Sequence, residues 1–330
     1  MDYSLIFSEA MKLFSIMLPM IFIGFFLSNL LRATRYLEYT SIPMASITEM
    51  ARLPKTCSSV LTFFFLNSWS GMGMLSSFFH KRILGERDVI VTVLIAQLPK
   101  GLHSAIFFQA PVALAVLGYE IGLLLLFLEL LVFAGIAVAG IFIGRKILFK
   151  NPSEHGDNTE LSISEEKEKE KEKETGCIAR AGAVLQKSFH EFGKVALVLV
   201  PTTFLFIIIL NLGLAEYSAE TLQPLMNPLR LPDAAVIVFA ASFLSQIAVL
   251  SAAGTIVVIE QITVLQCLEM LFIARVLHLG IGYVKTSLPT NIALFGRKLG
   301  LRVTCVEGFM VETGLTCIVL LLIILQTYPG

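Results

Sequence analysis

Charged residues are scarce in this chain: Asp, Glu, Lys and Arg together make up 15% of its 330 residues. The common signatures of nucleotide and hydrolytic enzymes are missing too, since GxxxxGK[ST], GxSxG and HExxH do not occur. The five cysteines form no CxxC motif, so we expect them to be small packed side chains. The residues give no support to an enzyme, a cofactor, a metal centre or a nucleic-acid partner.

Apolar residues are abundant instead. The chain is 56% hydrophobic with a mean hydropathy of +0.80, which is too apolar for a soluble globular protein. The segments 13–31, 121–143, 195–214 and 303–325 each have roughly the twenty apolar residues that span a hydrocarbon core of about 30 Å. Residues 1–12 lack the basic region of a signal peptide, so 13–31 is interpreted as a retained first span. We therefore predict an all-α, polytopic integral membrane protein.

One stretch, 52–129, occurs twice at a constant offset of 178 residues. Without a gap, Arg52-Leu53-Pro54 aligns with Arg230-Leu231-Pro232, and Gly118 with Gly296. Several further matches are also Pro, Gly or Glu, which are rare in apolar segments. Pro19 and Asn29 match Pro201 and Asn211 at an offset of 182, so the first span belongs to the repeat. We predict membrane repeats at 1–149 and 191–330.

The polar block 150–190 separates the two repeats and contains an alternating Glu/Lys run at 165–174. Such a run cannot bury apolar area, so it is interpreted as a solvated helix or a disordered tether. A regulatory or partner-binding role is the alternative.

The apolar stretches 56–79 and 234–259 could each cross the bilayer once or enter and return as a re-entrant hairpin. Basic residues distinguish the two, because cytoplasmic loops retain Lys and Arg. With hairpins and an outside N-terminus, 20 of the 25 Lys and Arg fall inside; with full crossings, 14 fall on one side and 8 on the other. The distribution favours hairpins, and hence six spans, both termini outside and a cytoplasmic linker.

The positions of the basic residues also differ between the two repeats. Three basic positions beside the first hairpin (Lys81, Arg82, Arg87) become Ile259, Glu260 and Leu265 in the second repeat. Conversely, Tyr119, Glu120 and Leu124 become Arg297, Lys298 and Arg302. Positive charge thus changes ends, as it must if the second repeat is inverted in the membrane.

Polar side chains cluster at the predicted hairpin tips and on the Pro-interrupted helices that follow. Non-helical backbone at membrane depth is tolerated only where it is buried in protein or lines a cavity. Secondary transporters bind their substrate at such places, between two repeats. We predict a substrate-binding site where both tips meet both broken helices, formed by Asn67, Ser68, Ser70, Gln97, Lys100, Gln109, Ser245, Gln246, Arg275, Lys285, Ser287 and Asn291.

These side chains also have a structural interpretation. The hydroxyls and amides could bond neighbouring helices, at about 1 kcal/mol each. Arg275 and Lys285 would suit a phosphate or carboxylate, or could simply form ion pairs with buried acids. The candidate acids are Glu129, Glu269, Glu307 and Glu312.

Glu129 and Glu307 occupy equivalent positions in the repeats, and Glu312 adds a third acid. A buried carboxylate favours its neutral form, so these three are candidate sites for a coupling ion, H⁺ or Na⁺. Fixed salt bridges are the alternative. His103 and His278 do not align and show no metal-ligand spacing, so hydrogen-bonding roles are expected.

The repeated unit resembles the nucleoside-recognition or Gate domain. The resemblance is carried by Leu53-Pro54, the polar hairpin tip, the basic loop, Pro111 and Gly118, and by the same pattern from Leu231-Pro232 to Gly296. Such domains occur in concentrative nucleoside transporters, in the membrane part of ferrous-iron transporter B and in spore maturation proteins A and B. The resemblance implies a fold with a transport-like pocket. No motif matches nucleoside-contacting positions, and the iron transporter's GTP-binding domain is missing.

The expectation is a multi-pass plasma-membrane protein of six spans and two re-entrant hairpins. It would transport a small polar solute, with nucleosides or related anionic metabolites first by resemblance. Its partners would be the lipid bilayer, the solute, the coupling ion and further copies of itself as a homo-oligomer. The alternative is a non-transporting membrane scaffold, which the resemblance to spore maturation proteins also allows.

Overall fold

The computed structural model describes residues 41–148, 231–260 and 262–327, together with isolated positions within 11–26 and 182–208 and Leu229. All described elements are helical, and no strand occurs among them, which confirms the all-α class. Most of the lead-in 1–12 and of the linker 150–190 lies outside the described residues, as do most of the predicted spans 13–31 and 195–214. Phe14 and Phe204, from these two spans, pack with ring centroids 5.3 Å apart.

The helices of the two halves follow the same order. The first half contains α2 (Ser41–Met50), α3 (Thr56–Leu66), α4 (Ser68–His80), α5 (Glu86–Ile95), α6 (Gln97–Ser104), the π-helix η2 (Ala105–Gln109) and α7 (Ala110–Ile147). The second contains α11 (Ala235–Ser242), α12 (Gln246–Glu260), α13 (Val264–Gly282), the π-helix η4 (Tyr283–Ser287) and α14 (Leu288–Thr327). At an offset of 178, α4, α5, η2 and α7 begin where α12, α13, η4 and α14 begin. The backbone therefore repeats with the sequence.

The π-helices have a local cause. Proline lacks an N–H, and its ring collides with the carbonyl of the residue four positions earlier in a regular α-helix. Pro111 follows η2 and Pro289 follows η4, so in each half the wider π turn contains that carbonyl, of Phe107 and of Lys285. Each predicted Pro-interrupted helix thus contains a π turn just before its proline.

The chain reverses at two glycines. Gly118 has φ +81° and Gly296 has φ +80°, a conformation that other residues rarely adopt. A methyl group on Gly122 would lie 3.1 Å from the Ala113 carbonyl oxygen, although residues nine apart in one continuous helix are about 13 Å apart. Gly300 meets Asn291 in the same way. Each half therefore contains a long helical hairpin whose two arms meet at a glycine.

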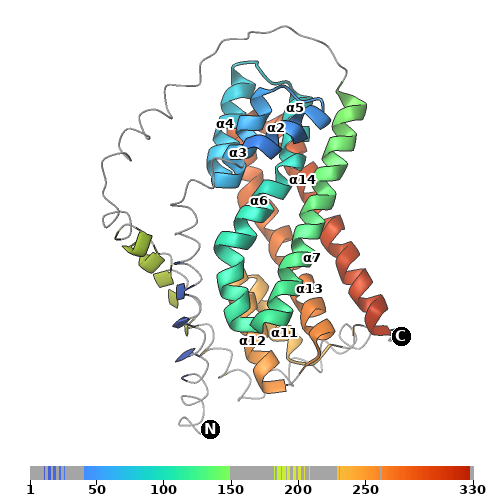
Figure 1. The fold of residues 1–330 in the computed structure, drawn as a ribbon. Helices are drawn as coiled ribbons and strands as arrows, with labels where there is room; N and C mark the ends of the chain where they lie inside the picture. The colour runs from blue at the N-terminus through green and yellow to red at the C-terminus, as the bar shows by residue number, and fades with distance from the viewer. Residues whose placement is uncertain are drawn as a thin grey trace.

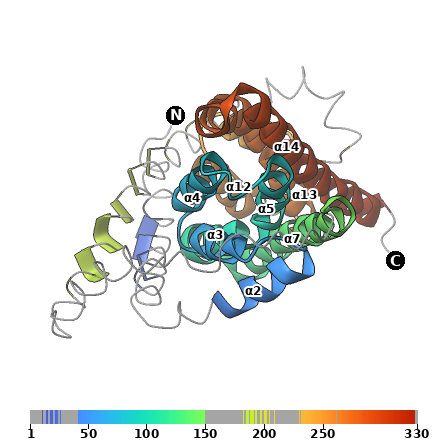
Figure 2. The ribbon, with the colours of Figure 1, turned by 90° about the horizontal axis from the view of Figure 1, so that it is seen from above.

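The stretches that fold back at these glycines, Glu86–Ile147 and Val264–Thr327, are the two described helical regions long and apolar enough to cross a membrane. The short helices α3 and α4 lie at one end of the bundle, and α11 and α12 lie at the opposite end (Figure 1). Seen along the bundle, α13 and α14 lie beside α7, and α2 packs outside α3 and α7 (Figure 2). The long hairpins thus form the body of the molecule.

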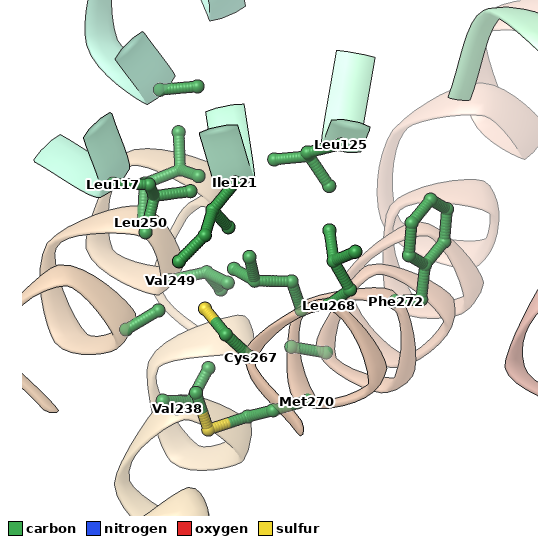
Figure 3. Packing of buried hydrophobic residues seen from close by; sticks show 14 of the residues in the cluster. Leu117, Ile121, Leu125, Val238, Val249, Leu250, Cys267, Leu268, Met270 and Phe272 are labelled. Carbon is green, nitrogen blue, oxygen red and sulfur yellow. The ribbon is translucent and has the colours of Figure 1, made fainter. Parts of the chain in front are cut away.

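The core joins the two halves. Figure 3 shows Leu117, Ile121 and Leu125 of α7 meeting Val249 and Leu250 of α12 and Leu268 and Phe272 of α13. These side chains are almost fully buried. The described helices of the second half thus bury their apolar faces largely against α7 of the first.

Each short hairpin packs against the glycine turn of the other half. Gly254 on α12 lies so close to Val116 that a methyl group there would be 2.9 Å from the Val116 carbonyl oxygen. The equivalent position on α4 is Ser76, whose hydroxyl donates to the carbonyl oxygen of Leu294 at 2.7 Å. Leu294 is the equivalent of Val116, and Ser76 is the equivalent of Gly254. Each half therefore contacts the other through equivalent positions.

Candidate functional site

Glu307 on α14 is buried and accepts two bonds from α6. The Gln97 amide donates to its Oε1 at 2.7 Å, and the Lys100 ammonium lies 2.9 Å from the same oxygen. Lys100 also sits over the ring of Phe64 in α3, with Nζ 4.9 Å from the ring centroid. The side chains of Gln97 and Lys100 reach the same acid because they are one helical turn apart.

Glu129 on α7 makes the corresponding contact with the second half. Its Oε1 lies 2.7 Å from Nε of Arg275 on α13. At an offset of 178, Arg275 is the equivalent of Gln97, and Glu129 is the equivalent of Glu307. Each half therefore supplies one acid and one donor, and both contacts cross between the halves. Arg275 thus forms the ion pair that was the alternative to an anion site.

The two contacts differ at the position that Lys100 occupies in the first half. Lys100 is replaced in the second half by His278, which does not reach Glu129 through a described bond. Its Nδ1 instead lies 2.8 Å from the backbone carbonyl oxygen of Ser242, where α11 ends. The second hairpin is therefore tied to its own broken helix through His278.

A small cavity of about 20 Å³ lies beside the Glu129–Arg275 pair. His278 and Gln246, the first residue of α12, line it together with apolar residues of α7, α12 and α13. The second carboxylate oxygen of Glu129 is buried and has no hydrogen-bond partner among the described residues. The space is sufficient for about one water molecule, which needs polar partners of this kind.

Two further acids lie in the bundle without described partners. Both carboxylate oxygens of Glu312 and of Glu269 are buried and accept no hydrogen bond within the described part of the chain. Arg275 is close enough to Glu312 for an electrostatic attraction between the two side chains. Among the described residues, four acids in the bundle (Glu129, Glu269, Glu307 and Glu312) outnumber the two cations paired with them, Lys100 and Arg275. A buried carboxylate without a positive partner favours its protonated form or a bound cation. The described residues contain no cluster of three or more His, Cys, Asp or Glu suited to a metal ion.

The predicted hairpin tips are present as breaks between short helices. Asn67 ends α3, and its Oδ1 accepts the backbone N–H of Trp69 at 2.8 Å. Ser245 caps α12, where its hydroxyl accepts the N–H of Ala248 at 3.1 Å. Ser68 is half-buried, and Ser70 lies in the first turn of α4. These two bonds of Asn67 and Ser245 are thus local helix caps.

The tips do not converge on one point. The first hairpin contacts α6, where Phe65 lies 6.5 Å from the His103 ring, and the second contacts α13. No extensive packing joins α3 or α4 to α11 or α12. The predicted single site therefore resolves into two equivalent polar contacts, around Glu307 and around Glu129.

The remaining predicted residues lie apart from these contacts. Gln109 is buried at the end of η2 and donates to the Ser104 hydroxyl at 3.2 Å; its equivalent, Ser287, is half-buried. Asn291 donates to Thr304 at 2.9 Å and so joins the two arms of the α14 hairpin. Lys285 is exposed and makes no ion pair within the described residues. Asn291 and Lys285 therefore lie outside the two acid contacts, and their role in binding a substrate stays a prediction.

The prediction missed the carbonyl of Ser242 and the ring of Phe64, because neither offers a chemical signal in the sequence. The pairing of a donor with an acid did leave a signal in the sequence. The offset of 178 places Gln97 on Arg275 and Glu129 on Glu307, so a donor and an acid recur together.

Comparison with known proteins gives three distant relatives, two of which cover most of the chain. It is 26% identical over 314 residues to uncharacterized protein MJ0880 of Methanocaldococcus jannaschii, covering 92% of this chain and 94% of that protein. It is 26% identical over 292 residues to uncharacterized protein MJ0871 of the same organism, covering 86% and 84%. A third, uncharacterized protein MJ1556, is 28% identical over 152 residues, or 44% of this chain and 46% of that protein. No family model matches the chain, and no solved structure matches it.

Proposed function

We propose that the chain is a membrane protein built as an inverted repeat and that it carries a small polar solute by alternating access. The reciprocal contact carries this proposal: an acid in each half meets a donor on the broken helix of the other half. Polar contacts of this kind can exchange partners when one half rocks against the other. The four arms 86–117, 119–147, 264–295 and 297–327 would be four of six spans, with 13–31 and 195–214 as the others.

The distribution of charge supports one orientation of the bundle in the membrane. Four segments meet at one end of the bundle: the α2–α3 connection, the α4–α5 connection, the end of α7 and the turn at Gly296. Together they carry ten basic residues: Arg52, Lys55, Lys81, Arg82, Arg87, Arg145, Lys146, Arg297, Lys298 and Arg302. At the opposite end, around Gly118 and the end of α12, no Lys or Arg occurs among the described residues. The basic end would therefore be cytoplasmic. Because the hairpins lie at opposite ends, they would enter the membrane from opposite sides (Figure 1).

The surplus of buried acids supports coupling to H⁺ or Na⁺. Among the described residues, neither the second carboxylate oxygen of Glu129, beside the cavity, nor the carboxylate of Glu312 has a hydrogen-bond partner. A cation bound there would relieve the unpaired negative charge, and its release would restore it. The substrate class is a small polar solute, with nucleosides first because of the Gate-domain resemblance. An anionic solute has less support, because Lys100 and Arg275 are already neutralised.

One observation favours a second candidate, a membrane scaffold that transports nothing. The cavity beside Glu129 is about 20 Å³, whereas pockets for small-molecule ligands are commonly about 300–1,000 Å³. A transporter would have to open this cavity in another conformation. A scaffold would keep it closed and would use the linker 150–190 to bind a partner.

The orientation is tested with single cysteines introduced into a variant that lacks the five native ones. A cysteine at Arg82 and a cysteine at Arg297 are expected to react with a membrane-impermeant thiol reagent only after cell lysis. A cysteine at Tyr119, on the opposite turn, should react in intact cells. Reaction of the Arg82 and Arg297 positions from opposite sides would contradict the inverted arrangement.

Transport is tested by solvent access to the two hairpins. We expect cysteines at Ser68 and Gln246 to react with an impermeant reagent in proteoliposomes, and a transported solute to slow that reaction. Nucleosides and phosphorylated metabolites are the solutes to screen. Phe127 is the matched control, because its exposed side chain on α7 would face lipid and a cysteine there should stay unreactive. If Ser68 and Gln246 positions are inert under every condition, the scaffold is favoured.

A further inference from the structure

The basic end of the bundle contains an open cleft that the reciprocal acid contacts do not use. It lies between the end of α4 and the start of α5, has a volume of about 510 Å³, and is lined by Phe79, His80, Arg82, Leu84 and Gly85. Its lining combines a guanidinium and an imidazole with apolar side chains. This combination fits a ligand that is anionic at one end and apolar at the other.

Both halves contribute to the surroundings of this cleft. Phe79 packs against Phe295 with ring centroids 6.0 Å apart, and His80 Nε2 lies 2.9 Å from the Leu294 carbonyl oxygen. These contacts bring the turn that carries Arg297 and Lys298 beside the loop that carries Lys81 and Arg82. All four of these basic side chains are exposed. The cleft thus opens into a positive field made by two loops that are far apart in the sequence.

The nearby acids are already engaged. Glu86 pairs with Arg302 at 2.9 Å, and the Asp88 carboxylate accepts the backbone N–H of Gly85 at 2.9 Å. The Arg82 guanidinium forms no ion pair with either carboxylate or with another described residue. The cleft consequently keeps its positive charge.

The backbone at Arg82 is strained. Its φ is +59°, at a helix end where glycine is the usual residue because it has no side chain to collide. Arg52 has the same φ, but its guanidinium donates to the Arg145 carbonyl oxygen at the end of α7. Arg82 has no described contact of this kind to offset its strain. Residues held in such conformations are concentrated at ligand clamps and other functional positions.

We propose that this cleft binds the phosphate headgroup of an anionic membrane lipid, with Arg82 as the phosphate-binding residue. The cleft lies at the end of the apolar helices, where headgroups would be. Ile83 next to Arg82 is 47% exposed, which would place an apolar side chain against the lipid tails. Arginine suits a phosphate because its planar guanidinium can donate two parallel hydrogen bonds.

The test uses the full chain in vesicles of phosphatidylcholine alone and of phosphatidylcholine with phosphatidylglycerol. The lipid retained by the purified protein is measured by native mass spectrometry, together with Tm. The unmodified chain should retain phosphatidylglycerol and show a higher Tm in its presence. Arg82→Gly should bind it about tenfold more weakly, as expected for loss of one charge-assisted contact. Because glycine relieves the strained backbone, Arg82→Gly should still fold.

Arg297→Gln is the matched control, since it removes the same charge from the same end but does not line the cleft. It should retain phosphatidylglycerol as the unmodified chain does. Equal losses in both variants, or no preference for phosphatidylglycerol in the unmodified chain, would overturn the proposal. If inorganic phosphate added to phosphatidylcholine vesicles reproduces the rise in Tm, the cleft takes a soluble phosphate and the lipid assignment is wrong.

Discussion

Arg275→Met is expected to lower the free energy of unfolding by about 3–5 kcal/mol, because it leaves Glu129 buried without its positive partner. The pair is almost completely enclosed: the side chains of Arg275 and Glu129 are 11% and 3% exposed. A methionine fills much of the space of the arginine but cannot compensate the carboxylate. The measurement is thermal or denaturant unfolding of the purified protein in detergent.

The double variant Arg275→Met, Glu129→Leu separates the lost charge from lost packing. Replacing both partners with apolar side chains of similar size is often neutral or stabilising, so most of the loss should be recovered. Arg302→Met is the second control, because the side chains of Arg302 and its partner Glu86 are 52% and 48% exposed. Exposed pairs contribute about 0–1 kcal/mol, so this variant should unfold nearly as the parent does. A large loss in Arg302→Met would contradict the ranking by burial.

Gly300→Ala is expected to destabilise the protein by about 3 kcal/mol or more, at the upper end for overpacking. The added methyl group would fall 2.6 Å from the carbonyl carbon of Asn291 and the same distance from Cα of Ile292. Both are backbone atoms, so no side-chain rotation can relieve the contact. The two arms of the α14 hairpin would have to separate, which would also break the bond between Asn291 and Thr304. Unfolding in detergent measures the loss.

Two other glycines provide graded controls. Gly296→Ala meets no atom within 4 Å but keeps a φ of +80°, so it should cost only the left-handed conformation, about 1–2 kcal/mol. Gly135→Ala meets nothing within 4 Å in a regular part of α7 and should stabilise by up to about 1 kcal/mol. If Gly300→Ala were tolerated as well as Gly135→Ala, the close approach of the two arms would be wrong.

The sequence predicted the breaks in the helices because proline and glycine act locally. Pro111 and Pro289 mark the π turns, and Gly118 and Gly296 mark the reversals, so each break could be placed within a few residues. The constant offset then related the second half to the first. The helical class followed from composition alone.

The sequence could not assign partners to polar side chains, because a partner depends on how helices pack. Asn291 looked like a ligand residue, yet its amide bonds Thr304 across a helical hairpin. Lys285 and Arg275 looked alike, yet only Arg275 faces an acid, since the π turn leaves Lys285 on the exposed side. Burial and direction decide these roles, and neither can be inferred from spacing alone.

The reciprocal acid contacts between the halves have a consequence for how the two halves could have diverged. One half contains both members of the contact, a donor at 97 and an acid at 129, so two separate identical copies could have made it twice. Identical copies would have to keep both contacts the same. A fused chain is free of that restriction, and here one contact uses Gln97 and Lys100 while the other uses Arg275, with His278 turned to Ser242. Covalent linkage thus permits each half to specialise in a task that a symmetric dimer would have to duplicate.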